Sequence, residues 1–164
     1  MILAGTGHRI RGLTDDPSLT AEAFMVTVRP RLLKLAVTAL KKYQPEGVLS
    51  GMAIGWDQTL AEAAIQCDIP WQAYVPFDGQ ERRWPDVLRK HYLDLLDAAG
   101  DIHYAAFQPS VSAFFTRNTR MIDAADEVVA LWSGRPGGTA HAVEYARTVG
   151  KPVHNLWKSW LRGR

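Results

Sequence analysis

The segment best suited to chemistry is SGRPGGTAHAVE, residues 133–144. It follows an apolar run at residues 128–132, which predicts a buried parallel strand, and leads into a predicted helix at residues 142–149. Its Gly-Gly pair lets backbone N–H groups approach a ligand without interference from Cβ atoms. The helix start adds unpaired N–H groups and a partial positive charge, which suit a phosphate. The alternative is a plain tight turn followed by an exposed Glu144.

Two more glycine-containing segments follow short predicted strands. GTGHR, residues 5–9, follows the apolar residues 1–4, and SGMAIGWD, residues 50–57, follows residues 48–49. The first combines backbone amides with a histidine and an arginine, which suits an anion. In the second, the serine and the glycine amides are candidates to hold a phosphate or a ribose. Its aspartate is predicted to cap or begin the next helix.

Such turns lie side by side where the carboxyl ends of parallel strands meet, at the switch point where open α/β sheets bind ligands. We therefore predict one ligand site built from these segments. The predicted ligand-binding residues are Gly5, Thr6, Gly7, His8, Arg9, Ser50, Gly51, Met52, Ala53, Gly55, Asp57, Asn118, Gly137, Gly138 and Thr139.

The elements that must position these residues alternate between apolar strands and helical patterns. Pro30 is predicted to kink or split the first helix. The alternation predicts an α/β fold, with a Rossmann-like, doubly wound and mostly parallel sheet covered on both faces. We expect a single domain over residues 1–164. The predicted strands are 1–4, 48–49, 69–77, 101–105, 127–132 and 151–156, and the predicted helices are 20–43, 58–66, 86–99, 113–125 and 142–149.

Composition restricts the class of protein. The chain has 164 residues, 47% hydrophobic and 22% charged, which indicates a globular domain rather than a disordered chain. The net charge of +2 and the scattered basic residues argue against a nucleic-acid partner. A single cysteine, Cys67, excludes an internal disulfide and favours a reducing compartment. We see no leader peptide and no run of the roughly 18 apolar residues that a membrane span needs, so we expect a cytoplasmic protein with no membrane partner.

Several common site types have no signature in the sequence. No Cys/His cluster has metal-ligand spacing, so we expect no metal. There is no Gly-Lys-Ser/Thr phosphate loop and no nucleophile-elbow sequence around a serine. We therefore expect no cofactor, and a small-molecule nucleotide as the ligand.

With these motifs described, the chain resembles the SLOG superfamily over residues 5–152. This superfamily of Rossmann-like domains includes the Lonely Guy phosphoribohydrolases, DNA-processing protein A, and the YpsA- and YspA-like proteins. SGMAIGWD is similar to the Ser-Gly-x-Ala-x-Gly-x-Asp turn of the DNA-processing and YpsA-like members. PGG at residues 136–138, followed by Glu144, keeps the spacing of the Lonely Guy motif Pro-Gly-Gly-x-Gly-Thr-x-x-Glu.

The resemblance also implies roles for two residues. In the Lonely Guy enzymes a catalytic arginine lies nine residues before the aspartate of an Ala-Asp pair, and here Arg117 has that spacing to Asp126. It therefore implies that Arg117 and Glu144 are catalytic, and that the chain forms a homodimer or higher homo-oligomer. The chain departs from the motif at Ala140-His141, which replaces Gly-Thr, and in the extra residues 133–135. The alternative for Arg117 and Glu144 is a structural ion pair between neighbouring helices.

These residues and the resemblance are consistent with three alternative functions. The one we favour is hydrolysis of the N-glycosidic bond of a nucleoside monophosphate or related nucleotide. Glu144 would stabilise the ribosyl cation or orient water, and Arg117 would position Glu144 or neutralise charge. The second is non-catalytic sensing of a nucleotide-derived ligand of the NAD or ADP-ribose type. The third is single-stranded DNA binding through tryptophan stacking and the basic tail at residues 157–164.

Overall fold

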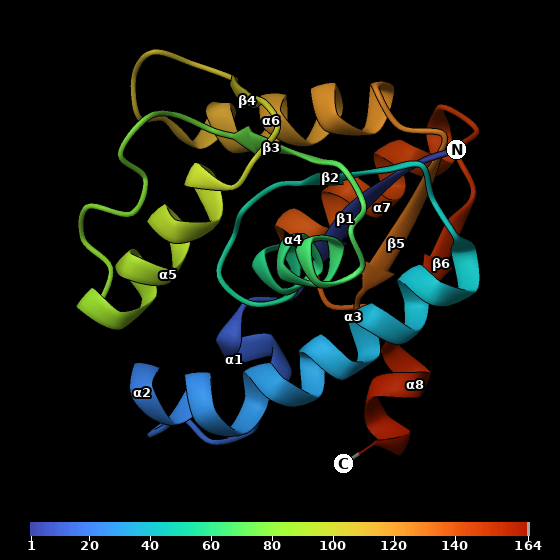
Figure 1. The fold of residues 1–164 in the computed structure, drawn as a ribbon. Coiled ribbons are helices and arrows are strands. Elements are labelled where there is room, and N and C mark those ends of the chain that lie inside the picture. Colours follow the sequence, from blue (N-terminus) through green and yellow to red (C-terminus); the bar gives the residue numbers. More distant parts are fainter. Residues whose placement is uncertain (164) are drawn as a thin grey trace.

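Six short parallel strands form one sheet in the order β4-β3-β2-β1-β5-β6 (Figure 1). The structure is a computed structural model and describes residues 1–163. The α/β, Rossmann-like prediction is confirmed, because every strand pair is parallel and helices connect the strands. The strands are β1 (Ile2–Gly7), β2 (Gly47–Ser50), β3 (Trp71–Val75), β4 (Ile102–Tyr104), β5 (Glu127–Leu131) and β6 (Val153–Asn155).

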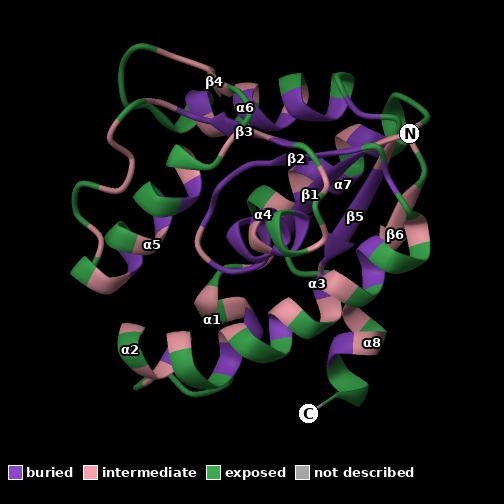
Figure 2. Cartoon of the chain, viewed as in Figure 1, coloured by how far each residue is buried: buried purple, intermediate pink, exposed green. Residues whose placement is uncertain are grey.

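Helices cover both faces of the sheet and create two apolar cores. Alternate strand residues point to opposite faces, so Leu3 packs in one core and Ala4 in the other. The larger core joins the sheet to α3, α4, α5 and α8, and the smaller one joins it to α6 and α7. In Figure 2 the central strands are buried and the outer helix faces are exposed. The helices are α1 (Ile10–Leu13), α2 (Ala21–Ala23), η1 (Phe24–Val28), α3 (Arg29–Tyr43), α4 (Trp56–Gln66), α5 (Asp86–Asp97), α6 (Val111–Asp123), α7 (Gly138–Thr148) and α8 (Trp157–Arg162).

Pro30 divides the first long helical segment, as predicted. A π-helical stretch, η1, ends just before the proline, and α3 begins with Pro30 in its first turn. Proline has no N–H group to donate to the preceding turn and its ring crowds that turn, so it is accommodated best where a helix starts. The wider turn of η1 lies where the regular ladder of hydrogen bonds cannot continue.

The first glycine-rich segment is not a turn, which corrects the predicted boundary of the first strand. β1 continues to Gly7, and Gly5 pairs with Ser50 of β2 and Val129 of β5. The glycines are needed for close packing, since a Cβ atom on Gly7 would lie 2.5 Å from atoms of Trp56. The small side chains therefore let α4 approach the central strand.

The start of α7 and the structure of the C-terminal tail also differ from expectation. α7 begins at Gly138 rather than at residue 142, because the helix starts directly on the Gly-Gly turn, before its apolar pattern begins. The aromatic tail forms α8 and packs on α3. There Trp160 is buried and the Arg31 guanidinium lies 4.5 Å from its ring centroid. Arg164, the last basic residue of that predicted tail, lies outside the described residues. Within residues 1–163, no helix is long and apolar enough to cross a membrane.

Candidate functional site

A cavity of about 490 Å³ opens at the carboxyl ends of β1 and β5. After β1 the chain continues to β2 on one side of the sheet, whereas β5 and β6 lie on the other, so this is the topological switch point. The lining residues come from the β1 end, α1, α6, the first residues of α4 and α7, and the turns that precede those two helices. The turn between β2 and α4, residues 51–55, is called the α4 turn below. They are Thr6, Gly7, His8, Arg9, Gly12, Ala53, Asp57, Val111, Phe114, Phe115, Arg117, Asn118, Arg135, Pro136, Gly137, Gly138 and Thr139.

The turn before α7 presents backbone amides to this cavity. Gly137 adopts φ +141°, a conformation that glycine tolerates far better than other residues, and it caps the helix without any side-chain bond. No atom lies within 4 Å of a Cβ built on Gly137 or Gly138, so the space beside the turn is open. Asn118 of α6 holds the turn, because its Nδ2 donates to the Gly138 carbonyl at 3.3 Å. Open amides at a helix N-terminus are a suitable cradle for an anion.

The cavity lining carries an excess of positive charge. Arg9, Arg117 and Arg135 line it together with one carboxylate, Asp57. Arg117 is only 6% exposed, and burial lowers its pKa while the nearby Asp57 charge opposes that effect. Its Nη1 donates to the Gly51 carbonyl and its Nε donates to Asn118 Oδ1 at 2.8 Å. Arg117 thus connects the α4 turn to the turn before α7.

Among residues 1–163, Asp57 is the only acid on the cavity lining. The residue is 5% exposed, and its Oδ1 has no hydrogen-bond partner among the described residues. Burial raises the pKa of Asp57 from 3.8 to about 6, although the Arg117 and Arg9 charges act in the opposite direction. A buried carboxylate with a perturbed pKa in a charged cavity is typical of a functional site.

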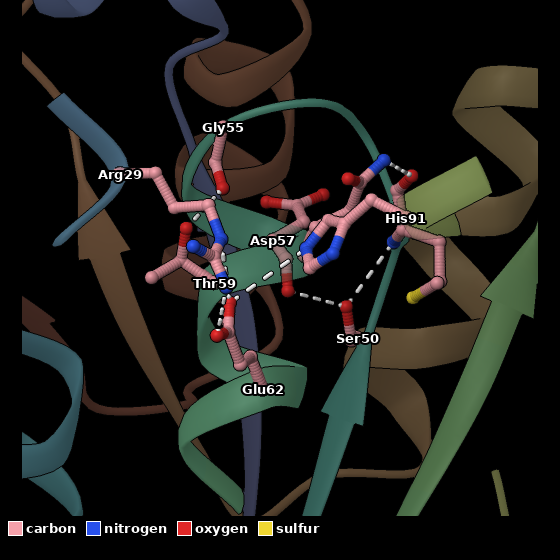
Figure 3. A network of polar contacts seen from close by, with 9 residues as sticks. Arg29, Ser50, Gly55, Asp57, Thr59, Glu62 and His91 are labelled. Atoms are coloured by element: carbon pink, nitrogen blue, oxygen red, sulfur yellow. Dashed lines mark hydrogen bonds and ion pairs between the residues drawn. The ribbon is translucent and has the colours of Figure 1, made fainter. Parts of the chain in front are cut away.

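The turn that carries Asp57 is held by its own polar contacts. Ser50 Oγ donates to the Asp57 carbonyl at 2.7 Å, and the Met52 N–H donates to Ser50 Oγ at 3.2 Å (Figure 3). Met52 adopts a left-handed φ of +59°, and Gln58 Nε2 donates to its carbonyl at 3.2 Å. A left-handed conformation is unusual for a non-glycine residue and persists only where the surrounding structure supports it.

A second polar cluster in Figure 3 lies outside the cavity lining. Arg29 donates from Nε and Nη2 to both carboxylate oxygens of Glu62, and His91 Nε2 lies 3.6 Å from Glu62. Burial and the Arg29 charge lower the pKa of His91 to about 4, so the imidazole is neutral at pH 7. This cluster joins α3, α4 and α5 and has a structural role.

His8 holds the loop that follows β5. The Ser133 N–H donates to His8 Nε2 at 2.8 Å, and Ser133 Oγ lies 2.7 Å from the same nitrogen. The N–H contact needs an unprotonated Nε2, to which the Ser133 hydroxyl then also donates, and burial together with the Arg135 charge lowers the pKa of His8. His8 therefore ties the end of β1 to the segment that carries Arg135.

The structure brings most of the predicted site residues together. Those on the cavity lining are Thr6, Gly7, His8, Arg9, Ala53, Asp57, Arg117, Asn118, Gly137, Gly138 and Thr139. The predicted residues outside the lining are Gly5, Ser50, Gly51, Met52, Gly55 and Glu144. Most of the second group shape the α4 turn or the β1–α4 packing, for example Gly55, which adopts φ +109° at the start of α4.

Glu144 and Arg117 do not form an ion pair within residues 1–163. Glu144 is exposed on α7, whereas Arg117 is buried against Gly51, Asn118 and the charge of Asp57. Among residues 1–163 no ion pair joins Arg117 to Glu144, so the alternative of a structural pair between these helices is wrong. The catalytic role implied for Glu144 stays a prediction.

Sequence reasoning missed the aromatic wall of the cavity. Val111, Phe114 and Phe115 recur on one face of α6, and Val111 is 75% exposed. Phe114 packs edge-on against Phe77, and the Arg9 guanidinium lies 5.7 Å from its ring centroid. The helical spacing of these residues with Asn118 was the available signal, because it places them on the same face of α6 as that predicted ligand-binding residue. Gly12, Arg135 and Pro136 were also missed.

No known protein-family model and no curated protein sequence matches the chain. Solved structures do match over most of its length. DNA processing protein A (DprA) from Streptococcus pneumoniae has a TM-score of 0.61 and 19% identity, covering 92% of this chain and 48% of its own. DprA from Helicobacter pylori, solved to explain its single-stranded DNA binding mode, has a TM-score of 0.61 and 20% identity, covering 93% and 63%. The chain therefore shares the fold of these proteins over most of its length.

TM1055, a structural-genomics target, is a third match. Its TM-score is 0.58 at 18% identity, and the alignment covers 93% of this chain and 71% of TM1055. The predicted resemblance to SLOG domains is therefore confirmed at the level of the fold. The chain spans less than two thirds of either DprA protein, so the matches describe a shared core.

Proposed function

We propose that this chain is a cytoplasmic protein that binds a nucleotide in the switch-point cavity and hydrolyses its N-glycosidic bond. One observation carries the proposal: open helix-start amides, an aromatic wall and a buried carboxylate with an unpartnered oxygen all line the same cavity. These features match the phosphate, the base and the sugar of a nucleotide. The SLOG-type fold, with the cavity at its switch point, also supports nucleotide binding at this site.

Each part of the ligand has a candidate partner. The phosphate would accept hydrogen bonds from the amides of Gly137 to Thr139, with Arg135 neutralising charge at the rim. The base would pack against Phe114 in the cavity wall, because a flat π-system stacks well on an aromatic ring. The cavity volume of about 490 Å³ lies within the usual size of small-molecule sites.

Hydrolysis adds a requirement for an acid beside the sugar. Such a group stabilises positive charge at C1′ or accepts a proton from the attacking water. The family resemblance assigns this role to Glu144, whereas Asp57 is the acid that lines the cavity. Arg117 lies near Asp57 and is suited to holding its charged form.

The experiment is a thermal-shift screen of nucleoside mono- and diphosphates, NAD and ADP-ribose, followed by chromatography of each mixture. A nucleotide that raises Tm and releases free base supports both parts of the proposal. A nucleotide that raises Tm and is recovered intact supports the sensing alternative. The absence of any shift across the panel refutes nucleotide binding. Arg135→Gln should weaken binding about tenfold, whereas Arg89→Gln on the distant, exposed surface of α5 should leave it unchanged.

Single-stranded DNA is the second candidate ligand. The fold match to Helicobacter pylori DprA favours it, since that structure concerns single-stranded DNA binding. The arginines of the cavity are suited to backbone phosphates as well. A gel shift with a labelled oligonucleotide at increasing salt tests this candidate. If a mononucleotide displaces the oligonucleotide, both ligands use this cavity.

We also propose that the chain forms a homodimer through the exposed apolar residues beside the cavity mouth. Phe107, Val111 and Phe115 are exposed by 103%, 75% and 40% respectively. Contiguous exposed apolar residues commonly mark an interface. Light scattering at micromolar concentration should give the mass of a dimer, and a monomer mass refutes this part of the proposal.

A further inference from the structure

The unpartnered oxygen of Asp57 is the feature that says most about the ligand. The carboxyl group is buried, yet Oδ1 receives no hydrogen bond within residues 1–163. A buried polar atom without a partner is costly, and native structures contain few of them. Because Asp57 lines the cavity, the missing donor can be supplied by whatever binds there.

The chemistry of a carboxylate restricts that donor. Ionised Asp57 only accepts hydrogen bonds, so its partner must be an O–H or N–H group. A phosphate at pH 7 is anionic and would be repelled, and it already has the amides beside α7. The sugar hydroxyls of a nucleotide are uncharged donors and lie between the phosphate and the base. An amino group on the base is the other possible donor.

The position of Asp57 favours the sugar. It lies in the first turn of α4, directly after β2, the strand that neighbours β1. The aromatic wall that suits the base belongs to α6, and the amides that suit the phosphate belong to α7. The base and the phosphate therefore have other partners, and the sugar is the part of the nucleotide left for the carboxylate. In dinucleotide-binding α/β folds, an acid that follows the first phosphate turn accepts hydrogen bonds from ribose hydroxyls in the same way.

We propose that Asp57 accepts hydrogen bonds from the sugar hydroxyls of the bound nucleotide, and that the cavity thereby selects ribonucleotides over 2′-deoxyribonucleotides. This inference rests on the proposed nucleotide binding but not on hydrolysis. It also distinguishes the cavity from a DNA site, since DNA lacks the 2′-hydroxyl that the carboxylate would bind.

The test is calorimetry with four pairs of probes, the 5′-monophosphates of adenosine, guanosine, cytidine and uridine and their 2′-deoxy counterparts. The wild-type protein should bind the ribo form of its preferred base about tenfold to a hundredfold more tightly than the deoxy form, because a charge-assisted hydrogen bond is lost. Asp57→Asn should reduce that ratio to below about threefold. Asp97→Asn, which changes an exposed carboxyl on α5, should keep the wild-type ratio.

Each outcome has one meaning. A wild-type protein that binds both sugars equally overturns the inference while leaving nucleotide binding intact, and this result needs no variant. An unchanged ratio in Asp57→Asn overturns it as well. A preference for adenine, cytosine and guanine, which carry amino groups, over uracil, with no effect of the sugar, assigns Asp57 to the base instead. If no monophosphate binds, the proposed function itself fails.

Discussion

Replacing Asp57 with asparagine should stabilise the protein at high pH. The pKa of Asp57 is raised from 3.8 to about 6, so the folded protein holds this proton more tightly than the unfolded chain does. Between pH 4 and pH 6 the folded state therefore binds more protons, and the free energy of unfolding falls as pH rises. Above pH 6 the buried, ionised carboxylate lowers the free energy of unfolding by a constant amount, and asparagine removes this loss.

The magnitude follows from the shift in pKa. A shift of about two units corresponds to about 3 kcal/mol once the group is ionised in both states. That value already contains the attraction of Arg117 and Arg9, which lower the pKa of Asp57. The backbone N–H groups of Gly7 and Ala53 also favour the carboxylate, although neither donates to Oδ1, and the uncharged asparagine would attract them less strongly. We therefore expect a net gain of roughly 2 kcal/mol at pH 8, or about 4 to 8 °C in Tm for a chain of this size.

The assay is urea unfolding followed by tryptophan fluorescence at pH 8, 6 and 4.5. The advantage of Asp57→Asn over the wild type should shrink by about 2 kcal/mol between pH 8 and pH 4.5, because the wild-type carboxyl becomes protonated in the folded state. Asp97→Asn should track the wild type at every pH. A variant that is less stable than the wild type at pH 8, or a difference that does not change with pH, would refute the argument that burial makes this carboxylate unfavourable.

Three other variants test the packing around the site. Gly7→Ala should lower the free energy of unfolding by about 1–3 kcal/mol, because the new Cβ would lie 2.5 Å from the buried Trp56, and chemical denaturation measures this. His8→Ala removes the acceptor of the Ser133 N–H and should cost about 1 kcal/mol at pH 8. Since the pKa of His8 is lowered, that cost should shrink as pH falls below 6.5, which unfolding at pH 8 and pH 5.5 would reveal. Trp160→Ala should cost about 3–5 kcal/mol by emptying the buried contact between α8 and α3, as differential scanning calorimetry would record.

Controls for these variants are available in the same chain. Gly138→Ala adds a Cβ where no atom lies within 4 Å, so it should change stability far less than Gly7→Ala does. Equal losses in the two alanine variants would contradict the packing argument. His103→Ala alters a partly exposed histidine that stacks on Tyr74 at the other end of the sheet. A pH dependence of the same size in this variant and in His8→Ala would show that the Ser133 contact is not its source.

The sequence by itself determined the class of fold and the order of its elements. Whether a segment forms a strand or a helix is set largely by residues a few positions apart. The alternation of apolar strands with helical patterns therefore predicted the parallel sheet, and Pro30 predicted the split helix. The Gly-Gly turn at the start of α7 was predictable for the same reason, since the amides that it exposes belong to a local strand-turn-helix pattern. Element boundaries were less accurate. Gly7 looked like a turn residue although it lies in β1, because its role depends on Trp56, far along the chain.

Tertiary structure alone decided how the candidate site is assembled. The local spacing that suggested Arg117 and Glu144 as partners says nothing about which side of each helix faces the cavity. Packing of α6 against the sheet places Arg117 beside the Gly51 carbonyl, 66 residues away in sequence, and near Asp57. Burial then raises the pKa of Asp57 to about 6. Which carboxylate is buried is set by how helices far apart in sequence pack together, and no pattern within a single segment carries that information.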